Sequence, residues 1–232
     1  MSSQAASSGR PYPPPPRAEP AWPCQAVIVL AIILQLTLPG RLRLGPTGLI
    51  PGLEGALAVG LFFATPRKLE GRHMVRRRVA LGLTSLVSLA NASSLALLTH
   101  ELLHPATAAT HTIDTISGRT LIVSGTLIWL TNVLIFGLWY WELDRGGPGQ
   151  RAEGHDGPPD FLFPQMTDDR IEPIAWRPLM LDYLYLSLTN ATAFSPTDTM
   201  PLSRQAKAVM AVQSLISLVT LGLVVSRAVN IL

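Results

Sequence analysis

The sequence predicts an all-α, polytopic integral membrane protein, a bundle of about six transmembrane helices. Of its 232 residues, 48% are hydrophobic and only 14% are charged, whereas a soluble globular domain carries about 25% charged residues. The apolar residues form blocks long enough to cross a bilayer, separated by short connectors that are charged or rich in Pro and Gly. The net charge of +3 is too small for a nucleic-acid-binding surface. The composition therefore indicates the lipid bilayer as the partner.

Residues 1–21 are rich in Ser and Pro and include a run of four prolines, which favours an extended conformation without a core. We therefore predict a disordered cytoplasmic tail. The first apolar block, residues 22–38, is expected to stay in the protein, because Pro39-Gly40-Arg41 is a poor signal-peptide cleavage site. Cys24 is the single cysteine, which excludes an internal disulfide.

Four apolar blocks predict a four-helix membrane region over residues 22–141, because a helix needs about 20 mainly apolar residues to cross a bilayer. The blocks are residues 22–38, 48–65, 79–103 and 120–141. A helix pair joined by a pore-like polar turn is predicted for residues 179–232, with residues 206–229 as its second helix. Its first helix, residues 179–200, is apolar enough to span but carries polar side chains, among them Asp182, Asn190, Thr192, Ser195 and Asp198.

The distribution of Lys and Arg predicts the sidedness of these spans. Residues 66–78 hold six basic residues and are expected in the cytoplasm. Six spans with both termini cytoplasmic place 13 of the 18 Lys and Arg residues on that side. Arg outnumbers Lys by 16 to 2, and Ala, Leu and Gly are frequent, which is typical of a GC-rich bacterial genome. The predicted location is a bacterial cytoplasmic membrane.

The longest connector, residues 142–178, is predicted to be an acidic cytoplasmic loop. It contains eight acidic residues and four arginines, and its Gly-Gly-Pro and Gly-Pro-Pro sequences oppose regular structure. A solvated loop is the first interpretation. The apolar residues Phe161–Pro164 suggest the alternative, a docking or lid segment.

Several polar residues lie inside the predicted spans, where each needs a partner or a water-filled path. Asn91, Asn132 and Asn190 are either interhelical hydrogen-bond partners or part of a polar path. In the last helix, polar residues share one face, which either lines a pore or packs against a neighbouring helix: Gln213, Ser217, Thr220 and Arg227.

The C-terminal half carries two resemblances. Residues 140–148 (YWELDRGGP), 160–166 (DFLFPQM) and 182–210 resemble a family of uncharacterised multi-pass bacterial membrane proteins of actinobacterial type, which implies the membrane class but no activity. The last fifty residues resemble, more loosely, the pore region of two-helix potassium channels. In that comparison residues 185–189 stand at the end of the pore helix and residues 192–198 at the filter.

The filter is degenerate in this comparison. A potassium filter needs glycines, because their unusual dihedral angles turn backbone carbonyls inward. Phe194, Ser195 and Pro196 occupy those positions, so a potassium-selective filter is not expected. A re-entrant loop entering from outside would also place residues 66–78 outside, against the charge distribution. We therefore expect residues 179–200 to span the membrane.

The favoured function is a channel- or transporter-like membrane protein that acts on a small ion or solute, without enzymatic activity or cofactor, and forms a homo-oligomer if its last helices line a pore. Asp198 is either an ion site or a helix cap, since Ser195–Asp198 is also good turn chemistry. The candidate path residues are Asn190, Thr192, Ser195, Thr197, Asp198 and Gln213.

A zinc-dependent membrane hydrolase is the alternative. His100, Glu101 and His104 match H-E-x-x-H, in which two His on one helix face bind zinc and the Glu acts as general base. His111 and Asp114 follow in the same connector, but Pro105 ends the helix directly after the second His. A third hypothesis is a structural, partner-binding protein that uses residues 142–178 for docking.

Overall fold

The computed structural model describes residues 20, 22–43, 52, 73–103, 118–152, 157–167, 176–194 and 198–229, without the side chains of residues 73–76. Most of the predicted tail and nearly all of the predicted span at residues 48–65 lie outside these ranges. The described elements are α1 (Trp22–Thr37), η1 (Gly40–Leu42), α3 (His73–Leu103), α4 (Gly118–Leu143), η2 (Asp144–Gly146), α5 (Pro148–Ala152), β1 (Phe161–Leu162), η3 (Pro164–Met166), α6 (Met180–Ala193), β2 (Met200–Pro201) and α7 (Arg204–Val229).

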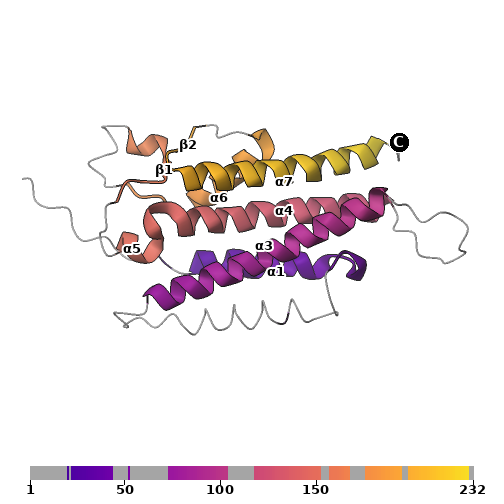
Figure 1. The fold of residues 1–232 in the computed structure, drawn as a ribbon, viewed down its shortest axis with the longest axis horizontal. Helices are drawn as coiled ribbons and strands as arrows, with labels where there is room; N and C mark the ends of the chain where they lie inside the picture. The colour runs from indigo at the N-terminus through magenta and orange to yellow at the C-terminus, as the bar shows by residue number, and fades with distance from the viewer. Residues whose placement is uncertain are drawn as a thin grey trace, which may run out of the picture.

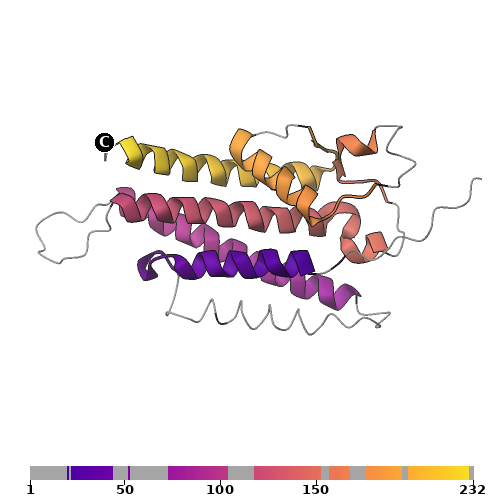
Figure 2. The same cartoon turned by 180° about the vertical axis from the view of Figure 1, so that it is seen from behind.

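The described chain is a bundle of helices lying along one axis (Figures 1 and 2). Among the residues that the structure describes, three helices are long and apolar enough to cross a membrane: Arg77–Leu103, Gly118–Gly146 and Arg204–Val229. α1 is apolar but has only 16 residues. The predicted all-α membrane helix bundle is confirmed.

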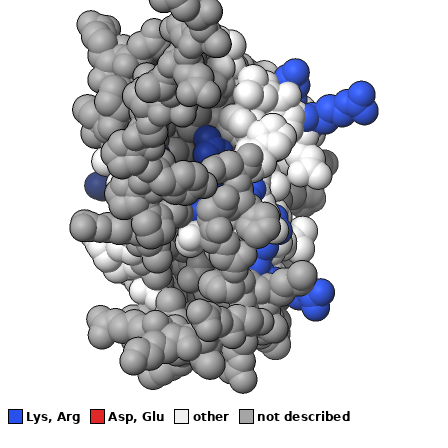
Figure 3. Space-filling model, turned by 90° about the vertical axis from the view of Figure 1, so that its left-hand side faces the viewer, with Lys and Arg blue, Asp and Glu red and all other residues white. Residues whose placement is uncertain are grey.

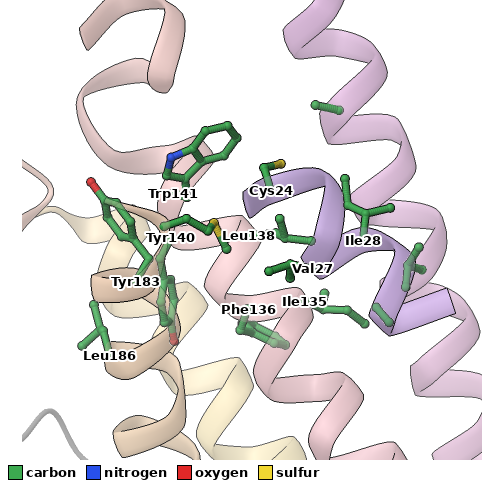
Figure 4. Packing of buried hydrophobic residues seen from close by; sticks show 14 of the residues in the cluster. Cys24, Val27, Ile28, Ile135, Phe136, Leu138, Tyr140, Trp141, Tyr183 and Leu186 are labelled. Carbon is green, nitrogen blue, oxygen red and sulfur yellow. The ribbon is translucent and has the colours of Figure 1, made fainter. Parts of the chain in front are cut away.

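α4 is the central helix, because α1, α3, α6 and α7 all pack against it. Its apolar residues are spread around the helix, as a helix surrounded by others requires. Figure 4 shows one part of the core, where Cys24, Val27 and Ile28 of α1 face Ile135 and Leu138 of α4. A second cluster joins the end of α1 to α3 and α4; its buried members are Leu38, Leu42, Leu95, Leu98, Leu121 and Ile128.

α4 runs antiparallel to α7. Asn132 donates a hydrogen bond to Ser217, while Tyr140, eight residues later, bonds to Gln213, four residues earlier. The end of the bundle where α4 stops and α7 starts is called the loop end, and the opposite one the far end. α1 begins at the loop end and α7 finishes at the far end (Figure 1). The described start of α1 and the described end of α7 thus lie at opposite ends of the bundle, whereas the sequence-based prediction places both termini on the cytoplasmic side.

α6 does not cross the bundle, and the prediction of a fifth span is wrong. Ser187 bonds to Val133, and Leu184 lies against Gly137, so α6 runs antiparallel to α4, as α7 does. Its 14 residues extend only about 21 Å, less than the roughly 30 Å of a hydrocarbon core. β2 then pairs with β1 at the loop end, where α7 begins (Figure 2). The segment therefore enters and leaves at the same end.

The packing of α6 against α4 depends on a glycine. A Cβ added to Gly137 would lie 2.7 Å from Leu184 Cδ2 and 3.3 Å from the Leu184 Cα atom. We expect Gly137→Ala to lower the unfolding free energy by about 1–3 kcal/mol, because the backbone of α6 would have to shift. Gly222→Ala on α7 is the control, since nothing lies within 4 Å of its Cβ position. Chemical unfolding in detergent micelles checks both variants, and equal stabilities would contradict the close contact.

The re-entrant arrangement makes a topological prediction. With Cys24→Ala as background, Gly157→Cys and Ser203→Cys should react with an impermeant thiol reagent from the same side of the membrane. Both positions belong to the loop end, since Leu202 N donates to Asp160 O at 2.8 Å. Ser117→Cys, next to the first residue of α4, should react from the other side. If residues 179–200 spanned the membrane, Ser203→Cys would instead react from the same side as Ser117→Cys.

Candidate functional site

The candidate site is the re-entrant helix α6 and the polar groups that hold it against α4 and α7. Its first turn is fixed by Asp182, whose Oδ2 accepts a hydrogen bond from Leu179 N at 2.7 Å. A carboxylate at this position caps free backbone N–H groups and is favoured by the helix dipole. At the other end, Phe194 has a left-handed backbone (φ 56°) that stops the helix.

A buried carboxylate anchors the start of α6. The Asp144 side chain is fully buried. Its Oδ2 accepts a hydrogen bond from the Tyr183 hydroxyl at 2.7 Å, and its Oδ1 accepts one from Asp160 N at 2.9 Å. Asp160 Oδ2 in turn accepts from Arg145 N at 3.0 Å. Asp144, Asp160 and Tyr183 thus join the end of α4, the connector and α6. These three residues are called the Asp144 anchor.

Arg151 of α5 closes the C-terminal end of α4. Its Nη1 donates to the carbonyl oxygens of Trp141 and Asp144 at 2.9 and 2.7 Å. Its guanidinium carbon lies 5.9 Å from the ring centre of Trp141 and 5.5 Å from that of Tyr183. A buried cation here satisfies terminal carbonyls, interacts favourably with the helix dipole and gains cation–π contacts.

The connector packs against the bundle at Phe161 and Phe163. Both are buried, and their rings contact those of Tyr140 (5.1 Å between the ring centres of Phe161 and Tyr140) and Tyr183 (5.6 Å from Phe163). The interpretation as a solvated loop is therefore wrong for these residues. The apolar segment that suggested a docking site docks onto the protein itself and positions β1 to pair with β2.

A buried polar network links α4, α6 and α7 through Gln213. Its Oε1 accepts hydrogen bonds from the Tyr140 hydroxyl and from Asn190 Nδ2, the latter at 2.8 Å. Its Nε2 donates to the Ser187 Oγ and carbonyl oxygen at 2.7 and 3.0 Å. Asn190 Nδ2 also lies 3.1 Å from the carbonyl oxygen of Met210. Buried polar groups of this kind require such partners.

The polar face of α7 packs against a neighbouring helix. Gln213, Ser217 and Thr220 are all buried, and Asn132 of α4 donates to Ser217 Oγ at 2.9 Å. Of the two alternatives for this face, packing against a neighbour is the one observed. Asn190 and Gln213, two of the candidate path residues, are accordingly bonded to one another inside the bundle.

The other candidate path residues lie at the periphery of the site. Thr192 is exposed, and its hydroxyl donates to the Leu188 carbonyl one turn earlier. Asp198 is exposed next to the buried Thr199, just before β2. Ser195 and Thr197 lie outside the described residues. The structure thus brings together Asn190 and Gln213, and leaves Thr192 and Asp198 on the surface.

The zinc hypothesis concerns the far end of α3. His100 and Glu101 are on the last turn of that helix, and His100 is exposed. His104, His111 and Asp114 lie outside the described residues. Within the described ranges, no three His, Cys, Asp or Glu side chains gather closely enough to hold a metal. Zinc binding stays a prediction, which metal analysis of the purified protein tests.

The loop end presents basic side chains. Figure 3 shows Lys and Arg on this face and no described acidic side chain. Two acidic residues of the connector, Glu142 and Asp144, are buried rather than displayed. The position of α7 brings Arg204 and Lys207 to this end and takes Arg227 to the far end. Among the described residues, α7 thus brings two basic side chains to the loop end and one to the far end.

The sequence interpretation missed Asp144, Tyr183 and Tyr140 as site residues. Asp144 is one of the eight acidic residues of the predicted loop, and neither tyrosine is among the candidate residues of the sequence analysis. One signal was available: Asp144 stands directly before Arg145-Gly146-Gly147, a sequence suited to the positive φ angles of 50°, 76° and 95° observed there. A tight reversal places the preceding carboxylate back against the bundle.

The fold and the site define a class: an all-α membrane helix bundle with a re-entrant helix held by a buried polar network. No family model matches the chain, and no curated protein and no solved structure is significantly similar to it. The function is therefore argued from the site alone.

Proposed function

We propose that the protein is a channel- or transporter-like membrane protein, and that α6 with the chain following it forms part of the path for a small cation. The observation that carries this proposal is the re-entrant course of α6. Non-helical backbone at membrane depth is stable only where protein buries it or where it lines a water-filled cavity. The last carbonyl groups of a helix that ends inside a membrane must therefore be reached by protein donors, water or a cation.

The direction of α6 favours a cation. The helix begins at the loop end and ends partway along the length of the bundle, where Asn190 lies level with Met210 and Gln213 of α7. The last carbonyl oxygens and the negative end of the helix dipole lie at this point. Half-helix C-termini coordinate cations in transporters by the same physics. The Asp198 carboxylate lies just before β2, and we place it near the loop-end opening of the proposed path, called the mouth, where it adds negative charge.

A homo-oligomer is part of the proposal. α7 exposes one long apolar side, on which Leu215, Leu218 and Val225 are more than half exposed. Thr192 and Phe194, at the end of α6, are exposed as well. A path along these residues would be enclosed only if a second copy of the chain covered them. The bacterial cytoplasmic membrane, with the loop end in the cytoplasm, is the location we propose from the basic residues.

Ion flux into liposomes tests the function. Liposomes holding the purified full-length protein should take up K⁺ or Na⁺ faster than protein-free liposomes. Asp198→Asn should reduce the rate about threefold at low ionic strength and less at high salt, because one screened charge near the mouth is removed. Glu101→Gln removes the same charge at the far end of α3 and should leave the rate unchanged.

Two results would contradict the proposal. The first is wild-type uptake no faster than that of protein-free liposomes for K⁺, Na⁺ and H⁺. The second is equal uptake by wild type and Asp198→Asn, which would remove Asp198 from the path. Native mass spectrometry of the same preparation measures the number of copies, and a strict monomer would contradict the oligomer.

A further inference from the structure

The starts of α6 and α7 lie side by side at the loop end. Asn190 of α6 donates a hydrogen bond to Gln213 of α7 at 2.8 Å, and both helices run away from the loop end. α6 begins ten residues before Asn190, at residue 180, and α7 begins nine residues before Gln213, at residue 204. The first turns of the two helices are therefore level with one another.

These first turns carry positive charge that the protein does not neutralise. Arg204 and Lys207 of α7 are exposed, and neither side chain has a hydrogen-bond or ion-pair partner among the residues that the structure describes. The first turn of α7 contains no acidic residue, so the positive end of its helix dipole opposes both charges. Arg177, exposed three residues before α6, adds a third. An anion from outside the chain would offset this cost.

An exposed apolar strip runs along α6 from the same end. Leu181, Tyr185 and Leu188 are 76%, 53% and 42% exposed, and spacings of four and three residues place them on one side of the helix. The strip extends over seven residues, about 10 Å. One leaflet supplies about half of a hydrocarbon core of roughly 30 Å, so a single leaflet covers the strip.

We propose that the starts of α6 and α7 bind an anionic phospholipid of the leaflet at the loop end. Its phosphate lies against Arg204 and Lys207, and its acyl chains lie along the strip on α6. The surface has the same order of polarity as such a lipid, with charge at the bilayer surface and apolar side chains below it.

The charge of the surface favours an anionic lipid over a zwitterionic one. Of the described carboxylates nearby, Asp182 bonds to Leu179 N and Asp198 is exposed. Against these two negative charges stand the three positive charges of Arg177, Arg204 and Lys207, which leaves the described surface with a net charge of +1. A zwitterionic phospholipid offers the same chains without net negative charge.

This lipid site is compatible with the proposed oligomer and does not depend on ion conduction. Leu188 lies two residues before Asn190, whereas Leu215 lies two residues beyond Gln213. The strip therefore lies nearer the loop end than the side of α7 on which we place a second copy.

Native mass spectrometry of the full-length protein tests the preference for an anionic headgroup. The protein is titrated with phosphatidylglycerol and with phosphatidylcholine of the same acyl chains. Wild type should bind phosphatidylglycerol about 25-fold more tightly, because each of the two basic residues at the phosphate contributes about fivefold, the equivalent of about 1 kcal/mol. Arg204→Gln and Lys207→Gln should each lower the phosphatidylglycerol affinity about fivefold.

Arg119→Gln is the matched control. Arg119 is likewise exposed in the first turn of a helix, α4, but at the far end. The variant removes the same charge and should bind phosphatidylglycerol like wild type. Equal affinity of wild type for the two lipids, or the same loss in Arg119→Gln as in Arg204→Gln, would overturn the proposal.

Photolabelling of unmodified protein locates the acyl chains. Phosphatidylglycerol with a photoreactive acyl chain should label residues 181–188. Unlabelled phosphatidylglycerol should compete with the label, whereas glycerol phosphate at the same concentration should not, because it has the headgroup charge but no chains. Competition by glycerol phosphate would show a site for free phosphate groups, and labelling confined to other helices would show that something else, such as a second copy, covers the strip. Either result would overturn the proposal.

Discussion

Gln213→Leu is expected to lower the unfolding free energy by about 2–4 kcal/mol. The side chain is completely buried and serves four polar groups on α4 and α6. Leucine fills a similar volume but leaves the Tyr140 hydroxyl without an acceptor for its proton, and Ser187 Oγ loses one donor while it keeps its bond to Val133 O. Each unsatisfied buried group costs about 1–3 kcal/mol in water-soluble proteins, and interhelical bonds in membranes average about 0.6 kcal/mol. Unfolding by denaturing detergent measures the effect.

Gln205→Leu is the matched control for this prediction. Gln205 lies two turns earlier on α7 and is exposed, so its replacement should change stability by no more than about 0.5 kcal/mol. If Gln213→Leu proved as stable as Gln205→Leu, the buried network would not be what holds α6 to α7. The re-entrant helix would then depend on apolar packing and the Asp144 anchor alone.

Tyr183→Phe is expected to lower the unfolding free energy by about 1.5–3 kcal/mol and to make the loop end more accessible to protease. The substitution removes the hydroxyl that donates to Asp144 Oδ2, and hydrogen bonds to a charged group are worth more than neutral ones. The buried carboxylate keeps Asp160 N as a partner. Because the anchor joins the connector to α6, trypsin should also cleave after the buried Arg151 faster than in wild type.

Tyr185→Phe separates this effect from the general loss of a hydroxyl. Tyr185 is on the same helix, and its side chain is more than half exposed, so its hydroxyl is not required inside the bundle. Its variant should match wild type in stability and in the rate of cleavage. Cleavage that is equally slow in all three proteins would show that the Asp144 anchor does not hold the connector in place.

The packing of the acidic loop against the bundle could not be predicted from its composition. Eight acidic residues between positions 142 and 178 indicated a solvated segment, yet Asp144 is buried and Phe161 packs against Tyr140 and Tyr183. Composition averages over a segment and does not report which carboxylate meets a hydroxyl. That pairing depends on the turn at residues 145–147, which folds the chain back over the end of α4.

The sequence by itself determined the class of protein, because apolar length and scarcity of charge are set by the bilayer, whatever the tertiary contacts are. It also located α1, α3, α4 and α7 within a few residues. Only the tertiary structure decided whether residues 179–200 span or re-enter. Both courses need an apolar helix with some polar residues, and the choice depends on which partners those residues meet. Asn190 bonds to Gln213, and Tyr183 bonds to Asp144. These contacts hold α6 within the bundle, and β2, which follows it, lies again at the end where α6 started.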